Sequence, residues 1–473
     1  MEVVGRIPEK MALRGYSASD KPEFIAVCGR RRVGKTYLVR EFFGGDFAFY
    51  LTGLANANLK EQIAAFNEAA HDYYPSNIHK PEPVSNWMEA FGLLREIVEK
   101  SHAIGKKMIF IDELPWLDTP RSGFLTALEH FWNSWASSRP DVMLIVCGST
   151  TSWFIKNLLE NKGGLHHRLT GMIMLEPFTL GECEQYCESL GLFLNRQLLL
   201  GVYMALGGTP YYYSLFEKSL TLPQNIDALF FNETGMLKGE FDELYGSLFR
   251  NPKMHKQIVK AMSKKNTPMT RDEIIAEIKS GSGGTFSNTL EELAQCGFIE
   301  KYTDFKKTKN GSWYLLADAI SLFWLRFSGG RGKKEENFWV NHFSDTKARA
   351  WRRFAYEQIC WHHIRQVKKT LGIAGVSTTI STWRDKDAKS TEHVNLIIDR
   401  KDDVINICEI EFSESALAID KKRFDELTGK VQAFRAETGT KKAVHLTMIT
   451  PYGLKHNAFL GIADEEVTLN DLF

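Results

Sequence analysis

This 473-residue chain contains the loop Gly29-Arg-Arg-Arg-Val-Gly-Lys-Thr36, from which the expected fold follows. The loop fits the pattern G-x-x-x-x-G-K-[ST] without a mismatch, and the two glycines of that pattern let backbone N–H groups turn inward around a phosphate. Lys35 is placed to reach the β- and γ-phosphates of a nucleotide, and the Thr36 hydroxyl to ligate Mg²⁺. The residues assigned to nucleotide binding by this stretch are Gly29, Arg30, Arg31, Arg32, Val33, Gly34, Lys35, Thr36 and Tyr37.

The sequence on both sides of the loop favours a phosphate site over a chance match. Phe24-Ile-Ala-Val-Cys28 is typical of a buried strand that runs straight into the loop. Tyr37-Leu-Val-Arg-Glu-Phe-Phe43 predicts a helix after it. The N-terminus of that helix would face the bound anion, where free N–H groups and the helix dipole favour negative charge.

A second polar element follows the apolar run Met108-Ile-Phe-Ile111, which we expect to be another buried strand. Asp112 and Glu113 come directly after it. We expect Asp112 to hold the Mg²⁺ shell and Glu113 to polarise the attacking water. The alternative is that the two carboxylates only cap the next helix.

Short apolar runs alternate with helical patterns over the first 180 residues, which predicts an α/β fold with a parallel sheet. Val142–Cys147 and Gly171–Leu175 are two further expected strands. The pattern then becomes helical, and a Gly-rich basic linker is expected at Ser328–Lys334. The expected domains are a P-loop core at 1–180, a helical lid at 181–250, a winged helix at 251–330 and a small α/β domain at 335–473.

Composition places the chain among ordinary globular proteins, with 44% hydrophobic and 25% charged residues. Because no run of about 18 apolar residues and no leader pattern occurs, we expect a cytoplasmic protein without a membrane partner. The seven cysteines include no C-x-x-C pair, which favours neither a zinc site nor a disulfide framework. Cys183 and Cys187 are four residues apart, and we interpret them as idle thiols rather than metal ligands.

Several stretches together resemble a family of AAA+ ATPases that is common in archaea and some bacteria and related to the STAND signalling NTPases. The resemblance spans nearly the whole chain and is strongest between residues 24 and 180. Its motifs are specific for ATP binding and much less so for biological role. The stretches that carry it are Arg30–Phe43, Phe110–Trp116, Cys147–Thr150, Pro177-Phe178, Gly207–Tyr211 and Val4-Gly5-Arg6.

Five more residues have expected roles, most of them implied by the resemblance. Ser149, with Thr150 in reserve, would sense the γ-phosphate, the alternative being a simple turn. Arg168 would act across a subunit interface as an arginine finger, or else be an ordinary structural arginine. Pro210 would pack near the nucleotide in the lid, and Arg6 would lie near the adenine.

Residues 251–334 carry 15 Lys and Arg against 8 Asp and Glu, while the rest of the chain carries 44 against 50. Three helical patterns followed by two strands around Asn310-Gly311 predict a winged helix, which the family resemblance also implies. Lysines at the wing tip suit contact with a DNA backbone, although a winged helix used for protein contact is the alternative. The expected elements are Met254–Lys265, Thr270–Lys279, Phe286–Cys296, Ile299–Phe305 and Trp313–Leu316, with tip residues Lys306, Lys307 and Lys309.

The order of elements after residue 350 resembles the PD-(D/E)XK nuclease-like domain found in the same family. That resemblance implies Glu357 and Glu409 as Mg²⁺ ligands, but Asn395 stands where an Asp is expected and Glu411 where a Lys is expected. We therefore expect a weak or inactive nuclease, with Asp399 as either a substitute ligand or a turn residue. The expected elements are Trp351–Val367, Val376–Trp383, Glu392–Asp399, Val404–Phe412, Ile419–Thr438 and Lys442–Ile449.

These patterns predict an ATP- and Mg²⁺-binding enzyme that hydrolyses ATP and acts as a switch. The expected partners are ATP or ADP, DNA at the basic segment, and a protein partner or a second copy of the chain. Two alternatives remain open: a regulatory scaffold that holds nucleotide with little turnover, and an ATP-gated nuclease.

Overall fold

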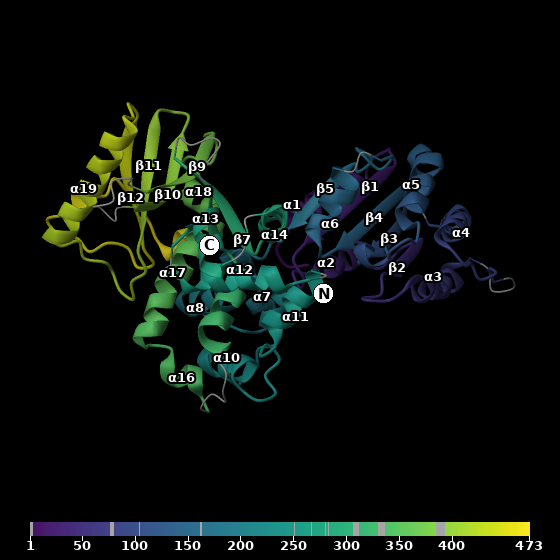
Figure 1. The fold of residues 1–473 in the computed structure, drawn as a ribbon, viewed down its shortest axis with the longest axis horizontal. Helices are drawn as coiled ribbons and strands as arrows, with labels where there is room; N and C mark the ends of the chain where they lie inside the picture. Colours follow the sequence, from purple (N-terminus) through teal and green to yellow (C-terminus); the bar gives the residue numbers. More distant parts are fainter. Residues whose placement is uncertain are drawn as a thin grey trace. The chain divides into compact units, whose positions relative to one another are not determined.

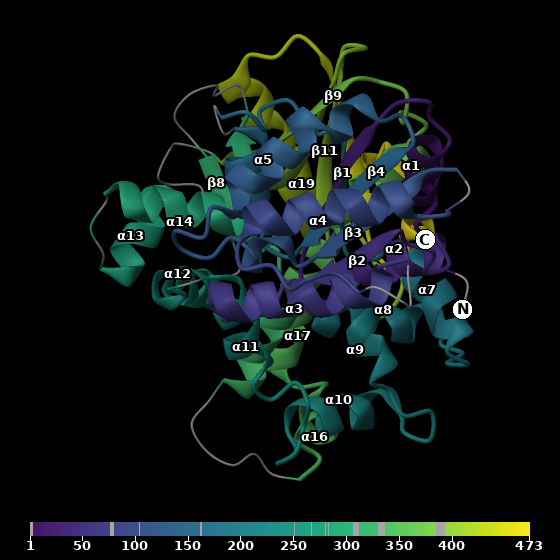
Figure 2. The ribbon, with the colours of Figure 1, turned by 90° about the vertical axis from the view of Figure 1, so that its right-hand side faces the viewer.

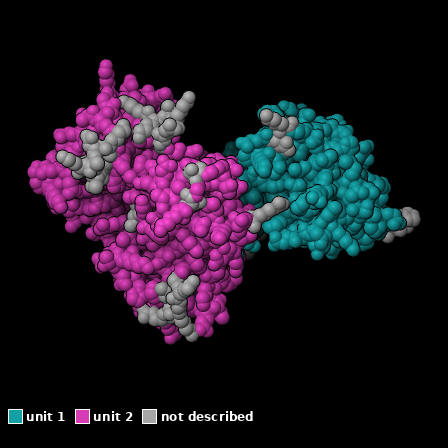
Figure 3. All heavy atoms as spheres, viewed as in Figure 1, with its two compact units in different colours: residues 1–177 teal, residues 178–473 magenta. Residues whose placement is uncertain are grey.

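A computed structural model describes most of the chain, and it divides into two compact units, Met1–Pro177 (unit 1) and Phe178–Phe473 (unit 2) (Figures 1 and 3). The two units are described separately below. The residues described by the structure are 3–75, 80–103, 105–160, 163–249, 251–265, 267–279, 281, 283–305, 312–329, 336–384 and 393–473.

Unit 1 is built on a five-stranded parallel sheet in the order β2-β3-β4-β1-β5. The strands and helices are α1 Ile7–Ser17, β1 Glu23–Gly29, α2 Lys35–Phe42, β2 Phe49–Thr52, α3 Leu59–Tyr73, α4 Trp87–Lys100, β3 Lys107–Asp112, η1 Leu114–Trp116, α5 Phe124–Ser134, η2 Ala136–Ser138, β4 Val142–Gly148, α6 Thr151–Phe154, η3 Ile155–Leu159 and β5 Gly171–Leu175. The predicted α/β fold class with a parallel sheet is confirmed. The four expected strands are all present, and β2 is a fifth that the sequence pattern did not predict.

Helices cover both faces of this sheet, so its strands read as continuous apolar runs. Side chains alternate along β1: Phe24 and Ala26 face the cluster that also contains α3, α4 and α5. Ile25 and Val27 face the opposite cluster, which contains α1 and α2. Figure 2 shows α3 and α4 side by side over the sheet. Since all five strands are parallel, the loops after them gather at one edge, where ligands bind in open α/β sheets.

Unit 2 contains an eight-stranded mixed sheet in the order β13-β12-β11-β10-β9-β7-β8-β6, with helices packed around it. Its elements are α7 Leu180–Ser189, α8 Arg196–Leu206, α9 Pro210–Ser214, α10 Leu222–Phe230, α11 Glu240–Leu248, α12 Lys253–Lys264, β6 Met269–Thr270, α13 Arg271–Ile278, α14 Gly284–Gln295, β7 Ile299–Asp304, β8 Ser312–Leu316, α15 Ala319–Phe323, η4 Trp324–Ser328, α16 Phe338–His342, α17 Thr346–His362, α18 Ile364–Thr370, β9 Thr378–Arg384, β10 His393–Arg400, β11 Val404–Ile410, α19 Lys421–Thr438, β12 Ala443–Ile449, η5 Leu460–Ile462, β13 Glu465–Val467 and η6 Leu469–Leu472.

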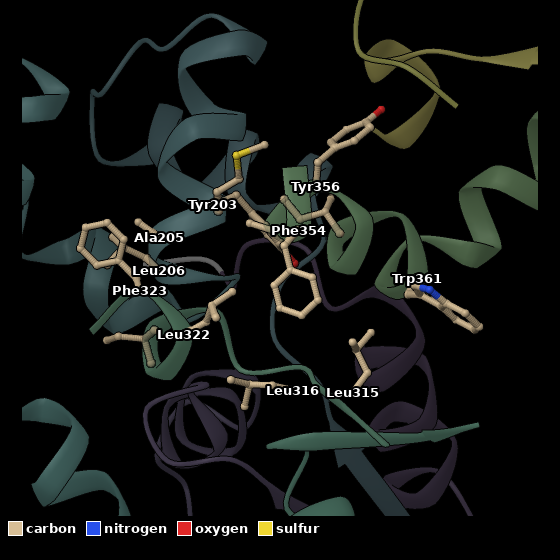
Figure 4. Close-up of a cluster of buried hydrophobic side chains, with 14 of the residues drawn as sticks. Tyr203, Ala205, Leu206, Leu315, Leu316, Leu322, Phe323, Phe354, Tyr356 and Trp361 are labelled. Carbon is tan, nitrogen blue, oxygen red and sulfur yellow. The ribbon is translucent and has the colours of Figure 1, made fainter. Parts of the chain in front are cut away.

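Unit 2 has a large hydrophobic core that extends from its first helices to its C-terminal strands, and a second, smaller core between the C-terminal strands and α19. The antiparallel pair β7–β8 joins the C-terminal strands because β7 also pairs in parallel with β9, with Thr303 opposite Ser381. Figure 4 shows side chains of α8, β8, α15 and α17 meeting in a single hydrophobic cluster. Segments expected as lid, winged helix and nuclease-like domain therefore pack on one another. The boundaries between these three segments stay predictions.

The long helix expected at Trp351–Val367 is wrong in one respect, because the chain turns at His363 between α17 and α18. The ring of His363 is buried, and its Nε2 accepts a hydrogen bond from the Leu180 backbone N–H at 2.9 Å. Several expectations lie outside the described residues: the wing tip with Lys306, Lys307, Lys309 and Asn310-Gly311, most of the linker at 328–334, and Glu392.

Candidate functional site

Lys35 lies at the first position of α2, directly after the glycine-rich loop, and is 5% exposed. Its amine donates to the carbonyl oxygens of Gly29 at 3.0 Å and Arg30 at 2.8 Å. It also donates to the Ser149 hydroxyl at 3.0 Å. Burial lowers the pKa of Lys35, and the nearby Glu113 carboxylate opposes that shift. The amine is thus held inside the loop, where it would meet a phosphate.

The loop passes so close to β5 that its first residue must be glycine. A Cβ on Gly29 would lie 2.3 Å from the carbonyl oxygen of Leu175, and the φ of Gly29 is +148°. Both facts exclude a side chain at this position without displacement of the backbone. The glycine in the sequence pattern therefore has a local steric reason.

Thr36 and Asp112 meet although they are 76 residues apart in the sequence. The Thr36 hydroxyl donates to Asp112 Oδ2 at 2.7 Å, and the Glu113 backbone N–H donates to Asp112 Oδ1 at 2.9 Å. Burial raises the pKa of Asp112, and the hydrogen bond from Thr36 opposes that shift. One hydroxyl and one carboxylate are hard oxygen donors of the kind that hold Mg²⁺ together with waters and phosphate oxygens. The donor set fits Mg²⁺.

Glu113 stands next to this pair with a left-handed backbone, at a φ of +51°. Non-glycine residues rarely adopt this conformation, and it costs free energy that the surroundings must offset. The Ser149 hydroxyl donates to Glu113 Oε1 at 3.3 Å, so it bridges Glu113 and Lys35. Burial raises the pKa of Glu113, while the Lys35 charge opposes that shift. A carboxylate of this kind is a stronger base toward a water molecule.

Arg6 lies beside the loop, and its buried side chain binds backbone carbonyl groups. Its guanidinium donates to the carbonyl oxygens of Glu176 at 2.6 Å and Val33 at 3.2 Å, and the residue is 3% exposed. The segment expected near the adenine therefore holds the loop in place through its arginine. The expected contact of Arg6 with nucleotide stays a prediction.

Of the remaining predicted residues, Tyr37 and Thr150 directly follow cluster residues in the sequence, Arg168 lies in the segment before β5, and Pro210 belongs to the other unit. Arg168 is exposed, and its Nε donates to the Gly164 carbonyl oxygen at 3.3 Å. Tyr37 is 45% exposed on α2. Pro210 is the first residue of α9 in unit 2, and Thr150 is half-buried just after Ser149.

Sequence reasoning missed two residues near the turn that starts at Glu113. Gly53, after β2, packs against the Glu113 carbonyl group, and Gln62 in α3 donates to the Trp116 carbonyl oxygen at 3.0 Å. Gln62 is fully buried, although glutamine is a polar residue. The capping box of α3, in which Asn58 and Glu61 cap each other, is visible in the sequence as a helix start. Gln62 precedes Ile63 on the buried face of that helix, which is the signal that could have found it.

A second group of polar residues lies in unit 2, and we name Glu357, Asn395, Glu409, Glu411, Arg423 and Lys430 the carboxylate cluster. Arg423 donates to Glu409 Oε1 at 2.7 Å and to Glu411 Oε2 at 3.0 Å. Lys430 donates to Glu409 Oε2 at 2.7 Å. Both oxygens of Glu409 are thus bound by cations of α19.

The carboxylate cluster does not fit a divalent cation. Arg423 and Lys430 already neutralise Glu409, and burial next to that carboxylate raises the pKa of Glu357 to about 8. Asp399, the possible substitute ligand, is paired with Lys442 at 2.7 Å. Among the residues that the structure describes, no group of three or more His, Cys, Asp or Glu side chains is arranged to hold a metal ion.

Comparison with known proteins adds to this geometry. No protein-family profile matches the chain. An uncharacterised protein of Methanocaldococcus jannaschii is 26% identical over 330 residues, which are 68% of each protein. A Walker-type ATPase of Pyrococcus abyssi matches with a TM-score of 0.50 at 18% identity, over 68% of this chain and 96% of that one. The ORC2 protein of Aeropyrum pernix, solved in complexes with ADPNP and ADP, gives a TM-score of 0.35 at 13% identity over 68% and 93% of the two chains.

Unit 1 has a P-loop α/β fold, a five-stranded parallel sheet with helices on both faces. The likeness to the Pyrococcus ATPase and the strand order of the parallel sheet support this, and the helical region of unit 2 follows it in the chain. Within the described part of the chain, no helix is both long and apolar enough to cross a membrane.

Proposed function

We propose that the chain is a Mg²⁺-dependent ATPase that acts as a nucleotide-controlled switch. The observation that supports this best is the convergence of Lys35, Thr36, Asp112, Glu113 and Ser149 at one edge of the sheet, through hydrogen bonds of 2.7–3.3 Å. An ATPase needs a cation for the phosphates, hard oxygens for Mg²⁺ and a base for the water. These five side chains provide all three.

Each residue would have a defined task. Lys35 would exchange its bonds to loop carbonyls for bonds to the β- and γ-phosphates. Thr36 and Asp112 would hold Mg²⁺, which supplies positive charge to the phosphate oxygens when bound. Glu113 would orient the attacking water and accept its proton, and Ser149 would contact the γ-phosphate. Arg168 is exposed, and we propose it as a candidate for contact with nucleotide of a neighbouring copy.

The second candidate function is a regulatory scaffold that holds nucleotide with little turnover. It is favoured by the bond between Ser149 and Glu113, because a carboxylate that accepts from the protein is less available to a water. An ATP-gated nuclease is disfavoured, since the carboxylate cluster is neutralised by Arg423 and Lys430. We propose DNA as a partner of the basic segment around α12 to β8, which suits contact with phosphates.

The first experiment is steady-state ATP turnover of the full chain with Mg²⁺, with and without duplex DNA, with Glu113→Gln as the control. Turnover that is stimulated by DNA and lost in Glu113→Gln would support a DNA-coupled ATPase. Negligible turnover in every condition, with ADP copurifying, would favour the scaffold. Absence of any ATP or ADP binding would contradict both.

A further inference from the structure

We propose that Gln62 is a positioning residue that holds the Glu113 carboxylate in its working place. The inference rests on the proposed ATPase function, because it concerns the base of that reaction. It assigns a task to a buried amide outside the phosphate loop and outside the motifs that identify nucleotide-binding proteins. Gln62 lies on α3, and Glu113 follows β3.

The amide of Gln62 makes three hydrogen bonds, two as a donor and one as an acceptor. Its Nε2 donates to the carbonyl oxygens of Leu54 at 2.7 Å and Trp116 at 3.0 Å, and its Oε1 accepts from the Leu54 N–H at 3.0 Å. Leu54 belongs to the loop after β2, and Trp116 ends the short helix η1. One side chain with no exposed surface therefore ties together the loops that follow two neighbouring strands.

Trp116 connects this amide to Glu113 through a tight turn. The Trp116 N–H donates to the Glu113 carbonyl oxygen at 3.0 Å, and the Leu117 N–H donates to Leu114 at 3.0 Å. The carbonyl groups at the end of such a short helix lack partners within it. Gln62 supplies the partner for Trp116 and so fixes the turn that starts at Glu113.

The loop after β2 supports Glu113 from the other side. The Gly53 N–H donates to the Asp112 carbonyl oxygen at 2.9 Å. A Cβ on Gly53 would lie 2.5 Å from the carbonyl oxygen of Glu113, so only glycine lets the two backbones approach this closely. Gln62 binds the next residue, Leu54, through both its N–H and its carbonyl group. The Gln62 amide thus binds two backbone segments near Glu113: the turn after it, at Trp116, and the loop after β2, at Leu54.

These hydrogen bonds explain how Glu113 keeps its φ of +51°. A strained conformation persists only where its surroundings enforce it, and such strain gathers at functional sites. Without the amide, η1 and the loop after β2 would lose their common partner, and Glu113 would be free to relax. Its carboxylate would then leave the place beside Ser149 where a water could be oriented. Lys35 and Thr36 are held by other contacts and would still bind nucleotide.

The test is single-turnover and steady-state ATP hydrolysis by Gln62→Leu in the full chain with Mg²⁺. We expect kcat to fall by about 10- to 100-fold, because small displacements of a reacting group cause losses of this size. KM for ATP and affinity for ADP should change less than about threefold. Gln62→Glu keeps the size and the acceptor but loses both donors, so it should lower kcat in the same way. In a Glu113→Gln background, Gln62→Leu should cause no further loss, because the residue acts through Glu113.

Asn67 offers a matched control on the same helix. Its amide makes the same kind of paired bonds with one backbone residue, donating to the Val84 carbonyl oxygen at 3.0 Å and accepting from the Val84 N–H at 2.9 Å. Asn67→Leu should leave kcat unchanged.

Three results would overturn the proposal: unchanged kcat in both Gln62 variants, a loss of ADP affinity that parallels the loss of kcat in both, or a further loss in the double variant. If Glu113→Gln itself left turnover intact, the proposed ATPase mechanism would fail first, and that result is read independently of Gln62.

Discussion

The phosphate loop of unit 1 and the carboxylate cluster of unit 2 both place carboxylates beside cationic side chains. At the loop, Lys35 reaches Glu113 through the hydroxyl of Ser149, and its other donors rest on backbone carbonyl groups. In the cluster, Arg423 and Lys430 bind Glu409 directly at 2.7 Å. The two sites therefore contain similar charges, but the cation and the carboxylate are linked through a hydroxyl at the loop and in direct contact in the cluster.

At the loop, the lysine is bound to neutral backbone groups that a ligand can replace, whereas in the carboxylate cluster the charged groups are already paired with each other. A cation bound to carbonyl groups can exchange them for a phosphate, which binds a charged amine more strongly. A carboxylate that is held by two cations has little affinity left for a metal ion. We infer that the charges of unit 1 serve binding and those of unit 2 serve packing.

The largest effect is expected when one lysine is removed from each site. Lys35→Ala should weaken ATP and ADP binding on the order of 100-fold, since charge-assisted bonds to phosphate are lost. Lys430→Ala should leave nucleotide affinity unchanged, because its partner is Glu409. Calorimetric titration of the full chain with ADP measures both. Equal affinity for ADP in wild type and Lys35→Ala would refute the assigned phosphate site.

The free energy of unfolding should depend more on the carboxylate cluster than on the phosphate loop. Glu409→Gln leaves Arg423 and Lys430 without their shared carboxylate, and such a loss from a largely buried pair costs about 3 kcal/mol of unfolding free energy. Glu113→Gln should cost less than about 1 kcal/mol, because burial already disfavours its charge, as its raised pKa shows. Denaturant unfolding of both variants, each compared with wild type, checks the contrast. A similar loss in both would show that the two carboxylates play the same structural part.

The sequence predicted unit 1 better than the details that make it work. A loop pattern and four apolar runs predicted four of the five strands of the sheet, because parallel strands covered on both faces must be apolar throughout. The left-handed backbone of Glu113 and the bonds of Gln62 depend on contacts between loops that are far apart in sequence, which no local pattern encodes. In the carboxylate cluster, the sequence showed Glu411 in the place of a lysine. It could not show that α19 brings Arg423 to both Glu409 and Glu411 and Lys430 to Glu409. The wing tip lies outside the described residues, so its role stays a prediction.

The stability of unit 2 should depend on pH through the buried His363. Burial lowers the pKa of His363 to about 4, and its neutral ring accepts from the Leu180 N–H. The unfolded state binds a proton near pH 6.5, so stability is fully present above that pH and is lost as pH falls toward 4. Between pH 7 and 5 the contribution of this residue should fall by about 2 kcal/mol.

His363→Gln removes the titrating group and keeps an acceptor for the Leu180 N–H. The unfolding free energy of this variant should therefore depend less on pH between 7 and 5 than that of the wild type. Denaturant unfolding at the two pH values measures this. An identical pH dependence in wild type and variant would show that other groups cause it.

The smallest effect tests whether the two units unfold separately. Asn58 caps α3 in unit 1 and Thr179 caps α7 in unit 2, each within a capping box. Asn58→Ala and Thr179→Ala should each cost about 1 kcal/mol. ADP stabilises only the part of the protein that binds it. In scanning calorimetry, Asn58→Ala should therefore lower the transition that ADP raises, and Thr179→Ala should lower the other. If both variants shifted a single transition equally, the units would unfold as one body, and the contrast between their sites would concern chemistry alone.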